Sequence, residues 1–232
     1  MKEMIKIKFN EFGIELTDRQ AEQFDEYMKF LLEENEKFNL TAITEPNDII
    51  LKHFIDSALP YAEIKAKARI IDVGSGAGFP GIPLKILRDD ISLVLVDSLQ
   101  KRVGFLQQLV KNLGLTKVTC VHSRAEDYAK LKRESFDYAV ARAVAQINTL
   151  SEYLLPFVKI GGMVIMYKGQ KAEEELEEGK KAISTLGGKI SEVLKYSIED
   201  AGERAVILIK KIKNTPVKYP RGRNYPKNKP IV

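Results

Sequence analysis

The stretch Asp72-Val73-Gly74-Ser75-Gly76-Ala77-Gly78-Phe79-Pro80-Gly81 decides the fold of this 232-residue chain. Residues 69–73, which are rich in β-branched side chains, predict a short strand, and residues 82–87 predict a helix that follows the turn. Glycines between a strand and a helix let the backbone adopt positive φ and approach a ligand closely. The stretch therefore predicts the ligand-binding turn of an open α/β sheet.

The flanking sequence predicts the rest of that sheet. Further strands are expected at 92–97, 117–121, 136–141 and 163–167, and helices at about 101–113, 126–131, 147–158 and after residue 167. Apolar strands that alternate with helices indicate a parallel sheet covered on both faces. The last two strands, 189–198 and 205–210, are separated only by residues 199–204, which leave no room for a helix, so they must pair antiparallel. A Rossmann-like seven-stranded sheet with a terminal antiparallel hairpin is the strand plan of class I S-adenosylmethionine-dependent methyltransferases.

The N-terminal part is predicted to form a small helical cap. Thr17 and Gln20 have capping-box spacing at the start of an amphipathic helix, and a second helix begins near Pro46 and is ended or kinked by Pro60. We expect three parts: a helical cap at 1–64, a methyltransferase domain at 65–213 and a basic C-terminal tail at 214–232.

The glycine turn allows two interpretations. Three of its glycines satisfy G-x-G-x-x-G, the fingerprint of an NAD-dependent oxidoreductase. That fingerprint is badly placed, because the strand has ended at Gly74, and Pro80 and Pro83 remove N–H donors that a pyrophosphate needs at the helix start. S-adenosylmethionine needs a partner for its ammonium and acceptors for its ribose hydroxyls, which Asp72 and Asp97 can supply at the ends of the first two strands. The alternative for Asp97 is a cap on the next helix.

Two further segments end strands at the same edge of the sheet. Ser123-Arg124-Ala125-Glu126 follows the third strand with capping-box spacing, where the adenine ring of the cofactor is also expected. Arg142 follows the fourth strand, at the edge where ligands of open α/β folds bind. We therefore expect both segments to line the cofactor pocket.

Positive charge is concentrated at the end of the sequence. Residues 210–232 contain eight Lys and Arg and no acid, whereas the formal net charge of the chain is +5, so residues 1–209 are net negative. Such a segment suits a phosphate backbone, and a merely solubilising tail is the alternative.

The amino-acid composition limits which other classes of protein this chain can belong to. No apolar run approaches the ~20 residues that span a bilayer. There is no secretory signal, and the single cysteine, Cys120, rules out an intramolecular disulfide or a cysteine-rich zinc site. We expect a soluble cytoplasmic protein without a metal, in which Cys120 fills core space.

The combined motifs resemble a known family, the small-subunit ribosomal RNA guanine-N7 methyltransferases called RsmG or glucose-inhibited division protein B. The resemblance covers essentially the whole chain, and the long glycine motif with Phe79-Pro80-Gly81 is its most specific part. Other matching segments are Asn39-Leu40-Thr41-Ala42-Ile43, His53 with Asp56-Ser57-Ala58-Leu59, Val96-Asp97-Ser98, Lys101-Arg102 with Phe105-Leu106, Arg142-Ala143, Lys168-Gly169 and Tyr219-Pro220-Arg221. Residues 222–225 depart from the usual Lys-Ala-Gly-Thr-like stretch, but Asn224 can adopt the left-handed conformation of a glycine.

The resemblance implies methyl transfer from S-adenosylmethionine to N7 of a guanine in the decoding-region loop of 16S ribosomal RNA. The partner would be small-subunit rRNA or the 30S subunit, with no membrane, and the protein would be a monomer. The expected cofactor-binding residues are Asp72, Gly74, Gly76, Gly78, Phe79, Asp97, Ala125, Glu126 and Arg142. The expected RNA-binding residues are Lys101, Arg102, Lys168, Arg221, Arg223, Lys227 and Lys229.

The implied reaction needs no general base, because N7 of guanine carries an in-plane lone pair and no proton. Catalysis would depend on aligning N7, the methyl carbon and the sulfur. Arg142, His53 and Lys168 are candidates for orienting the substrate, and we interpret His53 as a hydrogen-bonded brace between cap and sheet. Phe79 is expected to pack on the cofactor, guide the base or belong to the core. A methyltransferase-like domain retained only for binding or assembly is the remaining alternative.

Overall fold

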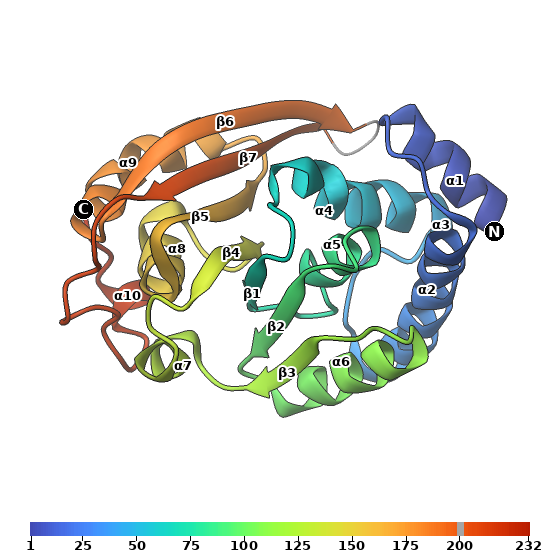
Figure 1. Ribbon diagram of the computed structural model, residues 1–232, viewed down its shortest axis with the longest axis horizontal. Coiled ribbons are helices and arrows are strands. Elements are labelled where there is room, and N and C mark those ends of the chain that lie inside the picture. Colours follow the sequence, from blue (N-terminus) through green and yellow to red (C-terminus); the bar gives the residue numbers. More distant parts are fainter. Residues whose placement is uncertain (199–201) are drawn as a thin grey trace.

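The centre of the protein is a mixed sheet of seven strands (Figure 1). The computed structural model describes residues 1–198 and 202–232. The strands are β1 (Arg69–Val73), β2 (Ser92–Asp97), β3 (Val118–His122), β4 (Phe136–Arg142), β5 (Val158–Lys168), β6 (Gly188–Ile198) and β7 (Gly202–Lys211), in the order β3-β2-β1-β4-β5-β7-β6. β1 to β5 are parallel, and β7 is antiparallel to β5 and β6. The predicted terminal hairpin is confirmed, although residues 199–201 of its connection lie outside the described residues.

Helices cover both faces of the sheet. They are α1 (Lys2–Glu11), α2 (Asp18–Phe38), α3 (Pro46–Asp48), α4 (Asp56–Ala58), α5 (Gly81–Leu87), α6 (Gln100–Asn112), α7 (Ala125–Leu131), α8 (Ile147–Leu154), α9 (Ala172–Thr185) and α10 (Tyr225–Asn228). Figure 1 shows α1 to α6 on one side and α7 to α10 on the other. Successive strand residues alternate between the two apolar cores, as Ile70 and Ile71 do. The cap helices share the first core with the sheet.

The cap begins and bends where the sequence predicts. The Thr17 hydroxyl accepts from Gln20 N at 3.3 Å, and the Gln20 side chain accepts from Thr17 N at 2.9 Å. Residues 46–63 are almost continuously helical, with a π-helical segment at Ile49–Ile55 and a 3₁₀ turn at Leu59–Glu63. Pro60 has non-helical backbone angles, which confirms the predicted kink.

The helix predicted at about 147–158 is α-helical to Leu154 and continues as a 3₁₀ turn at Leu155–Phe157, before β5 begins at Val158. The change of helix type falls at Pro156, which lacks an N–H. One local prediction is wrong. The capping box predicted at Ser123 does not form: the Ser123 hydroxyl donates to Arg124 O at 3.0 Å, and α7 has no side-chain cap. Burial raises the pKa of the Cys120 thiol to about 11, in agreement with its interpretation as core filler.

Residues 214–232, which we call the C-terminal strap, fold back over α7 and α8. Thr215, Tyr219 and Pro226 are buried, and Tyr219 belongs to the second core. Asn224 adopts the predicted left-handed conformation, with φ 58° and ψ 13°.

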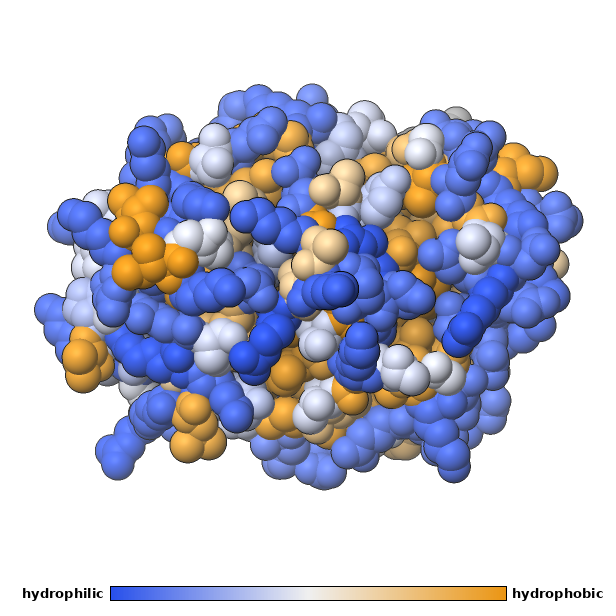
Figure 2. All heavy atoms as spheres, in the orientation of Figure 1, coloured by the Kyte–Doolittle hydropathy of each residue, from blue (hydrophilic) through white to orange (hydrophobic). Residues whose placement is uncertain are grey.

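The outer surface is largely polar. Figure 2 shows hydrophilic residues over most of one face, with apolar residues in separate groups. Across residues 1–198 and 202–232, no helix is both long and apolar enough to cross a membrane.

Candidate cofactor site

The glycine turn between β1 and α5 is shaped by close contacts. Gly74, Gly76 and Gly78 have φ values of +74°, +57° and +102°. A Cβ on Gly74 would lie 2.7 Å from Val144 Cγ2, and one on Gly78 would lie 2.7 Å from the Tyr27 hydroxyl. Side chains are therefore excluded at two of these positions by the protein itself as well as by backbone conformation.

Asp72, on β1, holds the far end of the turn. Its Oδ2 accepts from Gly81 N at 2.9 Å, whereas its Oδ1 is buried and has no hydrogen-bond partner among the described residues. Burial raises the pKa of this carboxyl to about 7. A buried, unpartnered carboxylate oxygen at a ligand-binding edge suits the ammonium group of an amino-acid ligand.

Asp97, the last residue of β2, joins the turn to the following segment. It is 3% exposed, and its two oxygens accept from Gly76 N and Leu99 N, each at 2.9 Å. Arg102 Nη1 lies 3.6 Å from Oδ2. The Asp97 side chain thus binds the backbone just before α6, but it is not the N-cap of that helix, which is Leu99 and has no side-chain cap. Each oxygen keeps a lone pair that could accept from a ribose hydroxyl.

A cavity of about 250 Å³ opens at the carboxyl ends of β1, β2 and β3. In Figure 1 the arrowheads of β2 and β3 end on the side where α7 and α10 lie. The lining residues are Val73, Gly74, Val96, Asp97, Ser98, Ser123, Arg124, Ala125, Glu126, Val144, Tyr153 and Asn224. The cavity thus combines close backbone approach at Gly74 with two buried carboxylates, Asp97 and Glu126. This donor and acceptor set fits a ribose and a nucleobase.

The cavity contains some of the predicted cofactor residues and three that sequence reasoning missed. Asp72, Gly76, Gly78, Phe79 and Arg142 do not line it; they surround the glycine turn beside it. The three missed residues are Val144, which follows β4, Tyr153 from α8 and Asn224 from the C-terminal strap. The predicted left-handed turn was the only sequence signal at Asn224, and none marked Tyr153.

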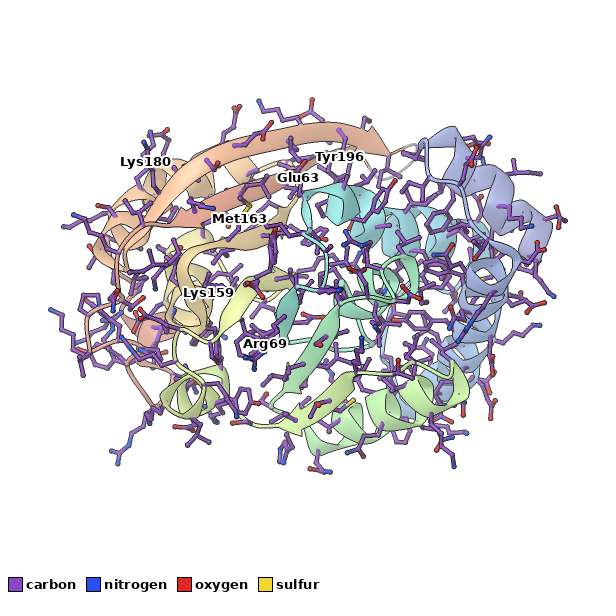
Figure 3. The ribbon with its side chains drawn as sticks, in the orientation of Figure 1. Glu63, Arg69, Lys159, Met163, Lys180 and Tyr196 are labelled. Carbon is purple, nitrogen blue, oxygen red and sulfur yellow. The ribbon has the colours of Figure 1, made fainter. Side chains whose placement is uncertain are left out.

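A second cluster connects the cap to the ends of β4 and β6. Arg142 Nη1 donates to Asp56 Oδ2 at 2.8 Å, and Arg142 Nη2 donates to His53 Nδ1 at 2.9 Å. The rings of Phe79 and His53 are stacked, with their centres 4.5 Å apart, and the Arg142 guanidinium lies 4.8 Å from the Phe79 ring centre. Tyr196 of β6, labelled in Figure 3, donates its hydroxyl to Asp56 Oδ1 at 3.0 Å. Arg142 is therefore held against the cap.

His53 is a neutral member of this cluster. Burial first, and the positive charge of Arg142 second, lower its pKa to about 3. Because a guanidinium can only donate, His53 Nδ1 accepts, and Nε2–H donates to the Thr41 hydroxyl at 2.8 Å. Both ring nitrogens are occupied, which agrees with the interpretation of His53 as a brace.

The predicted RNA-binding residues fall into two groups. Lys168 Nζ lies 2.6 Å from both Ala145 O and Glu175 Oε2, and Arg221 pairs with the buried Glu152. These two cations take part in internal contacts. The others have exposed or half-exposed side chains: Lys101, Arg102, Arg223, Lys227 and Lys229.

The fold is that of the class I S-adenosylmethionine-dependent methyltransferases. The fold is similar to TYW2 of M. jannaschii, solved in complex with AdoMet, with a TM-score of 0.56, 16% identity, and coverage of 68% of this chain and 76% of that one. It is also similar to TrmN of Thermus thermophilus, with a TM-score of 0.54, 15% identity, and coverage of 70% and 53%.

Sequence similarity identifies the family. Residues 20–206 match the family of the rRNA small subunit methyltransferase G. The chain is 50% identical to the ribosomal RNA small subunit methyltransferase G of Lactobacillus acidophilus over 97% of both chains, and 49% identical to that of Brevibacillus brevis over 95% and 94%. The chain belongs to this family and is an S-adenosylmethionine-dependent rRNA methyltransferase. The oxidoreductase alternative is therefore wrong.

Proposed function

We propose that this protein methylates N7 of a guanine in the decoding-region loop of 16S rRNA. The choice of N7 as the acceptor atom rests on His53. This histidine is largely buried, both of its ring nitrogens are hydrogen-bonded, and its pKa is about 3. Such an imidazole is a poor general base near neutral pH. N7 requires none, because its lone pair attacks without losing a proton.

We assign the cofactor to the cavity and the adjoining glycine turn. When bound, S-adenosylmethionine supplies an electrophilic methyl group on a sulfonium. Asp72 Oδ1 would pair with the ammonium, directly or through water, and Asp97 would accept from the ribose hydroxyls. Ala125 and Glu126 would border the adenine ring.

We assign the guanine to the side of the turn where Arg142, His53 and Phe79 meet. Their mutual contacts fix a cluster beside Asp72 in which Phe79 is buried and the partly exposed His53 and Arg142 side chains could orient a purine. Asp56 already pairs with Arg142, so this cluster carries little uncompensated charge when positive charge develops on the purine. Lys168 donates to the carbonyl of Ala145 after β4, and would orient the substrate through the position of that segment.

RNA phosphates would be bound by the exposed cations Lys101, Arg102, Arg223, Lys227 and Lys229. In this division of labour, residues 1–64 brace the acceptor side, residues 65–213 hold the cofactor and residues 214–232 contribute phosphate contacts. The substrate would be small-subunit rRNA, either free or within the 30S subunit, and the enzyme would act as a monomer in the cytoplasm.

The test is transfer of labelled methyl from S-adenosylmethionine to unmodified rRNA, followed by mapping of the modified base. We expect reduction and aniline treatment to cleave the product at one guanine of the decoding-region loop. Asp97→Ala should abolish labelling, whereas Lys180→Ala, at an exposed position of α9, should not. A methyl group found on an exocyclic amine or a ribose oxygen would refute the assignment of N7.

A further inference from the structure

The C-terminal strap closes one side of the cavity. Asn224 lines the cavity together with Asp97, Ala125 and Glu126, although it lies about a hundred residues further along the chain than α7. The backbone N–H of Asn224 donates to Glu126 Oε1 at 3.3 Å, and its side chain accepts from Arg124 Nη1 at 2.7 Å. The strap therefore contacts the segment that borders the nucleobase end of the cavity.

Asn224 is held in place from both sides. Before it, Arg221 binds the buried carboxylate of Glu152 through two side-chain nitrogens and its backbone N–H, at 2.6 to 3.1 Å. After it, Pro226 is buried, and its carbonyl accepts from the Thr149 hydroxyl at 3.2 Å. A residue fixed between two anchors keeps its position when a ligand arrives, which reduces the entropic cost of binding.

The contact with Arg124 determines how the Asn224 amide is oriented. A guanidinium has only donors, so the amide atom 2.7 Å from Arg124 Nη1 is the oxygen. The amide nitrogen, with two N–H donors, is then the group that Asn224 can offer to a ligand. Glu126, which is 3% exposed, offers carboxylate oxygens beside it.

This pair of groups is complementary to adenine. The edge of adenine presents an amine donor next to ring nitrogens that accept. The carboxylate of Glu126 can accept from the amine, and the amide nitrogen of Asn224 can donate to N1, the ring nitrogen beside that amine. Hypoxanthine reverses part of this pattern, because a carbonyl replaces the amine and N1 carries a proton, so it would place an acceptor against the Glu126 carboxylate.

We propose that Asn224 of the C-terminal strap is a cofactor-binding residue that recognises the adenine base together with Glu126. The proposal rests on the placement of the cofactor in this cavity. It makes the strap a wall of the cofactor site as well as a segment that carries exposed cations.

The test compares two ligands, S-adenosylhomocysteine and S-inosylhomocysteine, by calorimetry on the full-length protein. Asn224→Gly is the informative variant, because glycine tolerates the left-handed conformation and keeps the N–H that Glu126 accepts. Loss of one hydrogen bond should weaken S-adenosylhomocysteine binding about 5- to 10-fold. It should also reduce the preference for adenine over hypoxanthine, which a purely structural role would not change. Val217→Ala, at a position of the same strap that is 94% exposed, should alter neither quantity.

Asp97→Ala separates this proposal from the placement of the cofactor. If Asp97→Ala abolishes binding and Asn224→Gly leaves both affinities unchanged, the proposal for Asn224 is overturned and the cofactor site stands. A weaker affinity with an unchanged adenine preference would likewise overturn recognition by Asn224. Full binding by Asp97→Ala would refute the cavity as the cofactor site, and the proposal with it.

Discussion

Replacing Arg221 by alanine should destabilise the whole fold, because it leaves a buried negative charge without its partner. Glu152, on α8, is fully buried. Its carboxylate accepts from Arg221 Nε at 2.9 Å, from Arg221 Nη2 at 2.6 Å and from the backbone N of residue 221 at 2.7 Å. In Arg221→Ala only the backbone donor remains.

The expected loss follows from this geometry. Breaking a buried ion pair by removing one partner costs ~3–5 kcal/mol. The Arg221 side chain is 24% exposed and one N–H is retained, so we expect a loss of about 2–4 kcal/mol in the free energy of unfolding. In a chain of this size each kcal/mol moves Tm by about 2–4 °C, which gives a decrease of about 4–16 °C.

Thermal unfolding followed by circular dichroism at neutral pH measures this loss. Lys227→Ala removes an exposed cation from the same strap and should stay within about 0.5 kcal/mol of the unaltered protein. Adding Glu152→Gln to Arg221→Ala should recover part of the stability, because the unpaired charge is gone. If Arg221→Ala and Lys227→Ala melt at the same temperature, the buried pair is not what holds the strap.

Three further perturbations test the site. The pKa of His53 is about 3, against 6.5 in the unfolded chain, so the free energy of unfolding should fall as the pH drops from 6.5 towards 3. The variant His53→Gln should lack this contribution of His53 to the pH dependence. A protonated His53 in NMR spectra at about pH 5 would contradict the prediction. Asp72 has a pKa of about 7, so calorimetry should show that S-adenosylhomocysteine binds more tightly above pH 7, where Asp72 is ionised, than below it. The variant Asp72→Asn should lose this pH dependence of binding. Equal affinity of the unaltered protein above and below pH 7 would count against the contact with the ammonium group. Gly76→Ala meets no protein atom nearer than 3.9 Å and should cost only the ~1–2 kcal/mol of a left-handed alanine. Gly78→Ala, 2.7 Å from the Tyr27 hydroxyl, should lower Tm clearly more; equal shifts would refute the steric argument.

The features predicted from sequence are those with local signals. The glycine turn, the Thr17–Gln20 cap and the kink at Pro60 each depend on a few neighbouring residues, and the terminal hairpin follows from a connection too short for a helix. Where a local signal was incomplete, the prediction was wrong: Ser123 has capping-box spacing, yet its hydroxyl binds the Arg124 carbonyl.

The features missed from sequence depend on residues far apart in the chain. Lys211 counts as one more charge of a basic tail, but it is fully buried and donates to Leu155 O at 2.7 Å and to the Thr215 hydroxyl. The pair of Arg221 with Glu152, 69 residues away, gives a predicted RNA-binding cation an internal partner. Neither position differs in local pattern from an exposed basic residue, so only the folded chain distinguishes them.

The position of the C-terminal strap in the sequence also determines when its contacts can form during synthesis. Ribosomes make a chain from its N-terminus, and all seven strands precede residues 214–232. A nascent chain that has completed its sheet therefore carries Glu152 without a counter-charge and a cavity without the wall that Asn224 provides. Arg221, the partner of Glu152, is synthesised 69 residues after it. The sheet can collapse early, but the contact between Arg221 and Glu152 and the cavity wall at Asn224 form only after the strap has been synthesised.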